Sequence, residues 1–202
     1  MKIIKYEKMH DGNYQVYLDN NKKIIIHEDI ILKHKLLYKE EIDDKLYKLL
    51  EKENNDYDIY NKCVKYIAVR LRSIHEIRGY MKRKNISNEL IQETIDKLLV
   101  NNYLDDERFT KAFINDKLNF TTMGPYRIQM ELKKHNIDNS IIVKYINEID
   151  KNQIDEKINK QITKLMKSNK NRAYLKNKIY NNLINLGYQS DVILDNLRKY
   201  DI

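Results

Sequence analysis

Hydrophobic and polar positions alternate near the start of the chain. Between Tyr14 and Leu18, every second residue is apolar. A two-residue period of this kind is typical of a strand that buries one face. The preceding Asp11-Gly12 pair tolerates the positive φ of a tight hairpin turn. The pattern predicts three short antiparallel strands, near residues 2–9, 13–19 and 22–27.

Helices are expected after these strands, near residues 28–37 and 39–53, because a three-stranded sheet needs a partner to pack against. From about residue 56 the hydrophobic positions follow a helical period, and the pattern repeats at an offset of 51 residues. The first aligned column holds Ile77, Ile128 and Ile179. Four further columns also align: Met81 with Leu132 and Leu183, Ile86 with Ile137 and Tyr188, Ile91 with Ile142 and Ile193, and Ile95 with Ile146 and Leu197.

One fixed point of each repeat holds a residue that favours the left-handed backbone conformation, Asn85, Asn136 or Gly187. Such residues commonly end a helix. Two positions later, Ser87 and Asp138 are suitable N-caps for a following helix. Each repeat therefore contains a helix, a turn and a second helix, with a third helix in front. The leading helices are predicted near residues 57–70, 106–120 and 152–168.

The predicted fold is mainly α, with three tandem three-helix units that form an elongated, curved body behind a small N-terminal antiparallel β element. Only four glycines and one proline punctuate the chain, which favours long helices over a barrel or sandwich. The β element with its helices is assigned to residues 1–55. The three helical units are assigned to residues 56–104, 105–150 and 151–202.

Composition narrows the class of protein. The longest apolar runs are far shorter than the ~20 residues that span a bilayer, and the first residues lack the apolar stretch of a secretion signal. The single cysteine, Cys63, suits a reducing compartment. We therefore expect a cytoplasmic protein that is monomeric and has no membrane partner.

Positive charge is concentrated in the helical part of the chain. Residues 1–55 carry 11 lysines and 11 acids, while the remaining residues carry 27 basic and 19 acidic side chains, and 27 − 19 gives the whole net charge of +8. An excess of this sign favours polyanionic partners such as nucleic acid. Two basic clusters stand out: Arg70, Arg72, Arg78, Lys82, Arg83 and Lys84, and then Lys157, Lys160, Lys164, Lys167, Lys170 and Arg172.

The helix predicted near residues 152–168 separates its apolar and basic residues. Ile154, Ile158 and Ile162 share one face at four-residue spacing. The opposite face is predicted to hold Lys157, Lys160, Lys164 and Lys167. Four neighbouring ammonium groups repel one another, and a phosphate backbone would relieve that repulsion. The alternative is a solvated lysine face, which has the same sequence pattern.

Candidate catalytic and metal-binding residues have simpler explanations. Asp105, Asp106 and Glu107 stand in the first turn of a predicted helix, where acids cap free N–H groups and complement the helix dipole. The five histidines show no ligand spacing, so no catalytic residue, cofactor or metal site is predicted. Some tyrosines are suited either to stack on bases or to pack between helices. They are Tyr57, Tyr60, Tyr66 and Tyr80.

Three segments in a fixed order resemble the RecX family over about residues 57–200. Arg72-Ser73-Ile74-His75-Glu76-Ile77 is similar to the family's Arg-Ser-x-x-Glu-Leu motif, and Tyr103 to Phe109 is similar to its Leu-Asp-Asp-x-Arg-Phe motif. Gly124-Pro125-Tyr126-Arg127-Ile128 through Glu131-Leu132 resembles its Gly-x-x-Arg-Ile-x-x-Glu-Leu segment. Two positions depart from the family pattern: Thr110 stands for alanine and Asn136 for glycine.

The resemblance implies tandem three-helix repeats and an activity without chemistry. Family members bind the RecA recombinase filament and curb its ATPase, strand-exchange and co-protease functions, and some bind DNA themselves. The expected partners are therefore a RecA filament and single- or double-stranded DNA, with the two basic clusters as candidate contacts. A free-standing nucleic-acid-binding helical array fits the charge and the repeats equally well, and only the order of the motifs separates the two. An enzyme would need a convergent set of titratable groups, which the sequence does not show.

Overall fold

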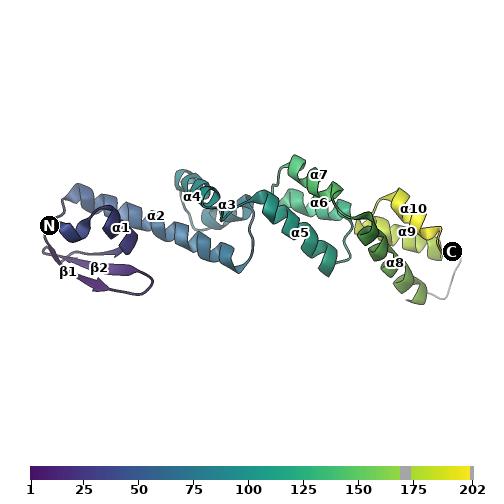
Figure 1. Ribbon diagram of the computed structural model, residues 1–202, viewed down its shortest axis with the longest axis horizontal. Helices are drawn as coiled ribbons and strands as arrows, with labels where there is room; N and C mark the ends of the chain where they lie inside the picture. Colours follow the sequence, from purple (N-terminus) through teal and green to yellow (C-terminus); the bar gives the residue numbers. More distant parts are fainter. Residues whose placement is uncertain (169–173, 201–202) are drawn as a thin grey trace. The chain divides into compact units, whose positions relative to one another are not determined.

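The computed structural model describes residues 1–168 and 174–200 of the chain (Figure 1). It is mainly helical, with a three-stranded sheet near the N-terminus. The chain divides into two compact units, which are described separately. The first unit holds residues 1–70 and 81–103, and the second holds residues 71–80 and 104–202. Among the described residues, no helix combines the length and the apolar character needed to cross a membrane.

The three predicted strands are confirmed as β1 (Ile3–Lys8), β2 (Asn13–Leu18) and β3 (Lys23–His27). They form an antiparallel sheet in the order β1-β2-β3. The hairpin between β1 and β2 turns at Asp11 and Gly12, which both adopt positive φ, 57° and 74°. Alternate residues of β2 and β3 point inward, so that Val16 and Ile26 are buried against the helices that follow.

The helices after the sheet differ from the prediction. A short α1 (Glu28–Lys33) and a 3-10 turn (Leu36–Tyr38) replace the first expected helix. One continuous helix, α2 (Asp44–Val69), replaces the two expected near residues 39–53 and 57–70. Asn54 lies within this helix and is buried, and its Oδ1 accepts a hydrogen bond from the backbone N–H of His27 at 2.9 Å. The division expected between residues 55 and 56 falls inside α2.

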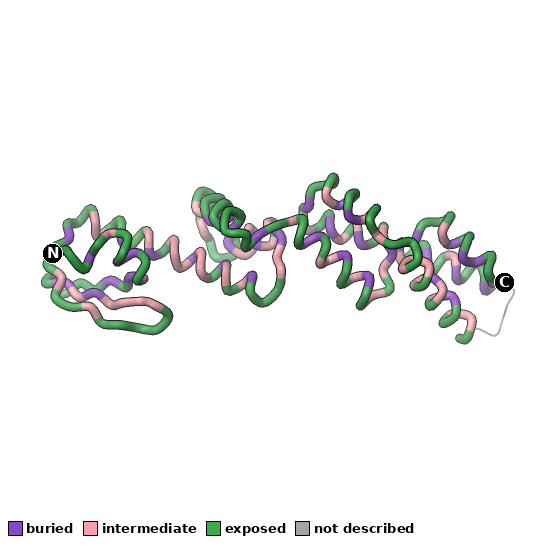
Figure 2. Tube along the Cα trace, in the orientation of Figure 1, coloured by how far each residue is buried: buried purple, intermediate pink, exposed green. Residues whose placement is uncertain are grey.

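The repeat columns are mostly buried, as the 51-residue offset predicts, although Ile86 and Ile146 are only half-buried. Ile77, Ile128 and Ile179 are each 0% exposed and lie on α3, α6 and α9. Figure 2 shows that buried positions recur along the helices. The helices concerned are α3 (Ile74–Lys82), α4 (Asn88–Val100), α5 (Asp106–Phe120), α6 (Pro125–Lys134), α7 (Asn139–Asn147), α8 (Lys151–Ser168), α9 (Leu175–Leu186) and α10 (Ser190–Leu197). The predicted leading helices near residues 106–120 and 152–168 are confirmed as α5 and α8.

The predicted turns are also confirmed. Asn85, Asn136 and Gly187 have φ values of 58°, 55° and 92°, so each adopts the left-handed conformation that ends a helix. After them, the side chain of Ser87 accepts from the N–H of Leu90, and that of Asp138 from Ser140. The first two turns thus close one helix and cap the next, whereas Gln189 after Gly187 makes no side-chain cap bond to α10.

Two hydrophobic clusters organise the second unit. One joins α5, α6 and α7 around Phe109, Ile128 and Ile142, and the other joins α8, α9 and α10 around Ile158 and Ile179. The helices of each group pack against one another (Figure 1). These are the second and third three-helix units of the predicted repeat.

The second and third three-helix units meet through backbone at two glycines. Gly124 N donates to Leu186 O at 2.7 Å, and Tyr126 N donates to Gly187 O at 3.1 Å. A Cβ on Gly124 would lie 2.5 Å from the carbonyl oxygen of Gly187, and Gly187 itself has positive φ. Glycine is required on both sides because the two backbones approach so closely.

Candidate nucleic-acid interface

Three lysines of α8 form an exposed row. Lys160, Lys164 and Lys167 line a shallow groove along the helix, together with Glu156, Asn159 and Thr163. On the opposite side of α8, Ile158 and Ile162 are fully buried against α9 and α10. We call Lys160, Lys164 and Lys167 the α8 lysine row. Helical periodicity therefore places these three side chains as the sequence predicts.

Lys157 departs from the expected stripe. Its ammonium group donates hydrogen bonds to the carbonyl oxygens of Leu118 and, at 2.7 Å, Thr121, at the end of α5. Burial lowers the pKa of Lys157 from its ordinary value, and the nearby charge of Lys160 lowers it further. The last carbonyl groups of a helix have no partner within the helix and attract cations. Lys157 thus holds α8 to α5, and its ammonium group is hydrogen-bonded within the protein.

The first basic cluster does not form one exposed surface. The side chain of Arg72 is only 11% exposed and lies 3.8 Å from the carboxylate of Glu76. Arg78 is half-buried, whereas Lys82, Arg83 and Lys84 are exposed at the end of α3 and in the turn after it. Arg70, also exposed, belongs to the first unit with Lys82–Lys84, while Arg72 and Arg78 belong to the second. Lys170 and Arg172 of the other cluster lie outside the described residues.

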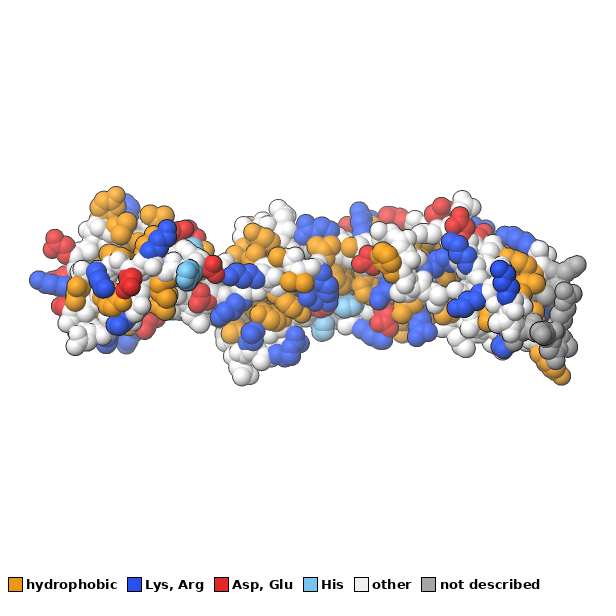
Figure 3. All heavy atoms as spheres, turned by 90° about the horizontal axis from the view of Figure 1, so that it is seen from below, with side chains coloured by type: hydrophobic (Ala, Val, Ile, Leu, Met, Phe, Trp, Pro, Cys, Tyr) orange, Lys and Arg blue, Asp and Glu red, His pale blue; other side chains and the backbone are white. Residues whose placement is uncertain are grey.

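Basic side chains do not gather into one patch on the face shown in Figure 3. Lysine and arginine side chains are spread over it, with acidic side chains among them. On this face, a polyanion would therefore contact local groups of lysines rather than one broad positive field. The α8 lysine row is such a group, because its three side chains are consecutive on one helix face.

The Arg-Ser-x-x-Glu segment builds a capping box at the start of α3. Ser73 Oγ accepts a hydrogen bond from Glu76 N at 3.2 Å, and Glu76 Oε2 accepts one from Ser73 N at 3.2 Å. This reciprocal pair satisfies two N–H groups that a helix start leaves unpaired. Arg72 then lies beside the carboxylate of Glu76. The motif thus has a structural role, which its Ser-x-x-Glu spacing was sufficient to indicate.

The acidic segment at the start of α5 caps two helices. Asp105 is the N-cap of α5 and accepts from Arg108 N at 2.9 Å, as predicted. Asp106 instead accepts a hydrogen bond at 3.0 Å from the backbone N–H of Ile74, the first residue of α3. Burial raises the pKa of Asp106, although the hydrogen bond from Ile74 lowers it. Glu107 accepts from Tyr145 Oη at 2.5 Å and from Lys144 at 3.3 Å.

Neither metal chemistry nor a reactive thiol is indicated by the side chains described. Within residues 1–168 and 174–200, no group of three or more His, Cys, Asp or Glu residues is placed to hold a metal ion. Cys63 is fully buried, and burial raises the pKa of its thiol to about 11. A thiol with such a pKa stays protonated and inert at neutral pH.

Sequence reasoning missed a cleft in the first unit. Its lining comes from α1, α2 and α4, and includes Tyr57, Tyr60 and Lys97. Local sequence patterns contain no signal for it, because the lining residues are brought together from distant segments. The sequence marks the two tyrosines as candidates for stacking, but it does not place them beside Lys97.

The fold defines a tandem three-helix repeat protein. Family models for the first and second three-helix domains of RecX match residues 60–98 and 105–144. Regulatory protein RecX of Oceanobacillus iheyensis is 25% identical over 96% of this chain and 74% of its own length. Regulatory protein RecX of Listeria welshimeri is 28% identical over 95% of this chain and 73% of its own length. Both family models and both of these relatives match the chain to the RecX family.

Solved structures share the fold. A crystal structure of regulatory protein RecX matches with a TM-score of 0.81 at 22% identity, over 96% of this chain and 98% of the other. The crystal structure of RecX from Lactobacillus salivarius matches with a TM-score of 0.69 at 23% identity, over 74% of this chain and 98% of the other. The first structure therefore shares the fold over nearly the whole chain, and the second shares it over about three quarters of the chain.

Proposed function

We propose that this chain binds RecA recombinase filaments on DNA and restrains their ATPase, strand-exchange and co-protease activities, with no chemistry of its own. Similarity to a family of regulatory proteins is the observation that carries the proposal. The chain would act in the cytoplasm, because recombinase filaments assemble on DNA there. In this proposal it acts as a monomer.

The α8 lysine row supplies the DNA contact in this proposal. Lys160, Lys164 and Lys167 are spaced by four and three residues, which corresponds to about 10 Å along a helix that rises 1.5 Å per residue. One DNA strand places a phosphate about every 3.4 Å along the duplex axis. The row therefore spans about three phosphate intervals, and its three ammonium groups can contact up to three phosphates. Lys157 contributes by holding α8 to α5 instead of by contacting DNA.

Exposed charge in the first unit supplies a second contact. Lys82, Arg83 and Lys84 end α3 and enter the turn at Asn85. Cations at a helix C-terminus are stabilised by the helix dipole, so their presence alone does not require a partner. In the proposal they meet either DNA phosphates or acidic side chains of the filament. Arg72 is assigned to the capping box, and Arg70 and Arg78 stay candidate contacts.

Co-sedimentation tests the proposal against a free-standing nucleic-acid-binding role. The chain is sedimented with single-stranded DNA alone and with RecA filaments on the same DNA. We expect the filament to retain more of the chain than bare DNA does. Equal retention by bare DNA and by the filament would favour a nucleic-acid-binding protein without a recombinase partner.

A further inference from the structure

A cleft of about 480 Å³ opens in the first unit between α1, α2 and α4. Its floor is a stripe of α2 that runs from Leu49 to Tyr57 and Tyr60, residues that share a face at helical spacing. Ile30 of α1 and Lys97 of α4 stand on the two walls. A volume of this size is typical of sites that hold a small organic molecule.

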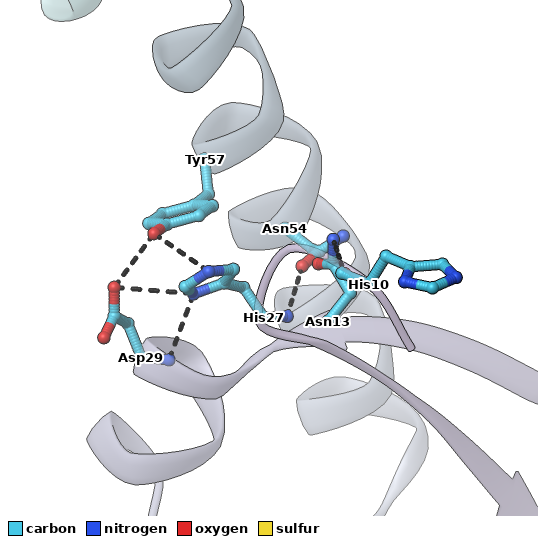
Figure 4. Close-up of polar contacts among 6 residues, drawn as sticks. All are labelled: His10, Asn13, His27, Asp29, Asn54 and Tyr57. Carbon is cyan, nitrogen blue, oxygen red and sulfur yellow. Dashed lines mark hydrogen bonds and ion pairs between the residues drawn. The ribbon is translucent and has the colours of Figure 1, made fainter. Parts of the chain in front are cut away.

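The aromatic part of the cleft is held in place by hydrogen bonds and ring contacts. Figure 4 shows Tyr57, His27 and Asp29 converging. The Tyr57 ring lies 4.2 Å from the imidazole of His27, at an angle of 31°. Its hydroxyl donates to Asp29 Oδ2 at 2.9 Å and lies 3.2 Å from His27 Nε2. Tyr57 is therefore fixed before any ligand binds.

Further contacts link His27 to Asp29. His27 Nδ1 accepts a hydrogen bond from Asp29 N at 3.2 Å and lies 3.4 Å from Asp29 Oδ2. His27 Nε2 lies 3.2 Å from the hydroxyl oxygen of Tyr57. His27, Tyr57 and Asp29 therefore form one connected group of polar contacts.

Tyr60 is fixed in the same way. Its hydroxyl accepts a hydrogen bond from Asn101 Nδ2 at 2.9 Å, and its ring packs against Tyr103 at 80°. Asn101 lies just after α4, so this bond joins the floor of the cleft to its α4 wall. Two ordered aromatic rings thus line one small cleft, which is the arrangement that stacks a planar ring with little loss of entropy.

The charged groups of the cleft divide into paired and available ones. Glu53 accepts from Lys33 at 2.9 Å and lies 2.8 Å from His34. Lys52 and Lys97 are exposed, and within the described chain no side-chain hydrogen bond or ion pair holds either of them. Two ammonium groups, on α2 and on α4, are therefore available to a ligand.

We propose that this cleft binds one nucleotide, with its base stacked on the Tyr57 and Tyr60 side chains and its phosphate bound by Lys52 and Lys97. Base stacking on aromatic side chains combined with lysine contacts to phosphate is the general chemistry of single-stranded nucleic-acid binding. The carboxylate of Asp56, which also lines the cleft, accepts a hydrogen bond from the exocyclic amino group of the base. The nucleotide is either free or an unstacked residue of a single strand. This site needs no recombinase, so it goes beyond the proposed function and is tested separately from it.

A partner helix is the rival occupant of this cleft. An apolar helix would need a continuous hydrophobic groove. Here the lining alternates apolar side chains with charged ones, including Lys52, Asp56 and Lys97. A helix would leave these groups partly desolvated without partners, whereas a nucleotide offers each of them one. The observations therefore favour the nucleotide.

The test is a series of ¹H–¹⁵N correlation spectra of the whole chain, which separate this cleft from the α8 lysine row. The probes are dAMP, dTMP, 2-deoxyribose 5-phosphate and a dodecamer of deoxyadenylate. We expect dAMP to shift amide signals of residues 29–33, 49–60 and 97–101, and dTMP, which lacks an exocyclic amino group, to shift them less. A dodecamer effect much stronger than that of dAMP would assign the site to single strands; equal effects would assign it to free nucleotides.

Variants complete the test. Tyr60→Leu should weaken dAMP binding about fivefold or more, the loss expected for one stacking partner. Lys52→Met and Lys97→Met change exposed side chains, so folding is retained, and each should also weaken binding. Lys62→Met, at an α2 position outside the cleft, is the matched control. Absence of cleft shifts with both dAMP and the dodecamer, or equal shifts with 2-deoxyribose 5-phosphate, would overturn the proposal.

Discussion

Lys157 shows how a single side chain can look like a ligand contact in the sequence and be a structural bond in the fold. The helical period of α8 places it with Lys160, Lys164 and Lys167. The end of α5 lies beside it, however, and two carbonyl groups there accept its hydrogen bonds. The position of a residue along a helix predicts which side chains share its face. It does not predict that the end of another helix lies beside that side chain.

Replacement of Lys157 should lower stability without altering the binding surface. Lys157→Met keeps the aliphatic stem but leaves the carbonyl groups of Leu118 and Thr121 without this donor. We expect a decrease of about 1 kcal/mol in the free energy of unfolding, measured by urea denaturation. Lys160→Met is the matched control and should unfold like the wild type. Equal stability of the two variants would contradict the structural role of Lys157.

Asp106 predicts a pH dependence of unfolding. Burial raises the pKa of Asp106, so the folded chain binds this proton more tightly than the unfolded chain. Its contribution to the free energy of unfolding therefore falls as pH rises from the ordinary aspartate pKa through the raised value. Asp106→Asn still offers an acceptor to Ile74 N and should lack this dependence. The stability of Asp106→Asn relative to the wild type should thus increase with pH across that interval; a difference that stays constant from pH 3 to pH 7 would contradict this.

At the scale of the element, the repeat was predictable and the continuity of α2 was not. The offset of 51 residues places Ile77, Ile128 and Ile179 correctly because a helix that packs on a core must repeat its apolar positions. The sequence predicts a break between residues 53 and 57. Asn54 instead bonds to His27, a residue 27 positions away, and no local pattern reveals that partner. The cleft in the first unit was missed for the same reason.

The turn between α6 and α7 gives a direct test of the repeat. Asn136 has a φ of 55°, a conformation that costs an ordinary side chain about 1–2 kcal/mol. Asn136→Ala should therefore lower the free energy of unfolding by about 1 kcal/mol, and so should Asn85→Ala. Asn136→Gly should be at least as stable as the wild type. Thermal melting of the three variants checks this; an alanine variant as stable as the glycine one would contradict it.

The α8 lysine row should behave as a phosphate-binding surface. Replacing Lys160, Lys164 and Lys167 with methionine should weaken DNA or filament binding and flatten its salt dependence by about 0.7–0.9 in log–log slope for each phosphate that is no longer neutralised. The free energy of unfolding should stay within about 0.5 kcal/mol of the wild type, because these side chains lie on the surface. An unaltered salt slope would show that the row is only a solvated face.

At the scale of the whole molecule, the family models, the relatives and the fold all point to similarity with RecX proteins. The motifs that revealed the family lie at a capping box, at a double cap and at the close approach of two glycines. They stabilise the repeats, and no ligand is assigned to them. Function is therefore expected to depend on exposed side chains outside these motifs.

The rate of ATP hydrolysis by RecA on single-stranded DNA tests the central claim most directly. The rate is measured at saturating ATP with increasing amounts of this chain, of the triple methionine variant of the α8 lysine row, and of Lys62→Met. We predict that the wild type and Lys62→Met lower the rate alike, while the triple variant needs a higher concentration for the same effect. A hydrolysis rate that stays unchanged at concentrations where the folded chain is in excess over RecA would contradict the proposed regulation of RecA.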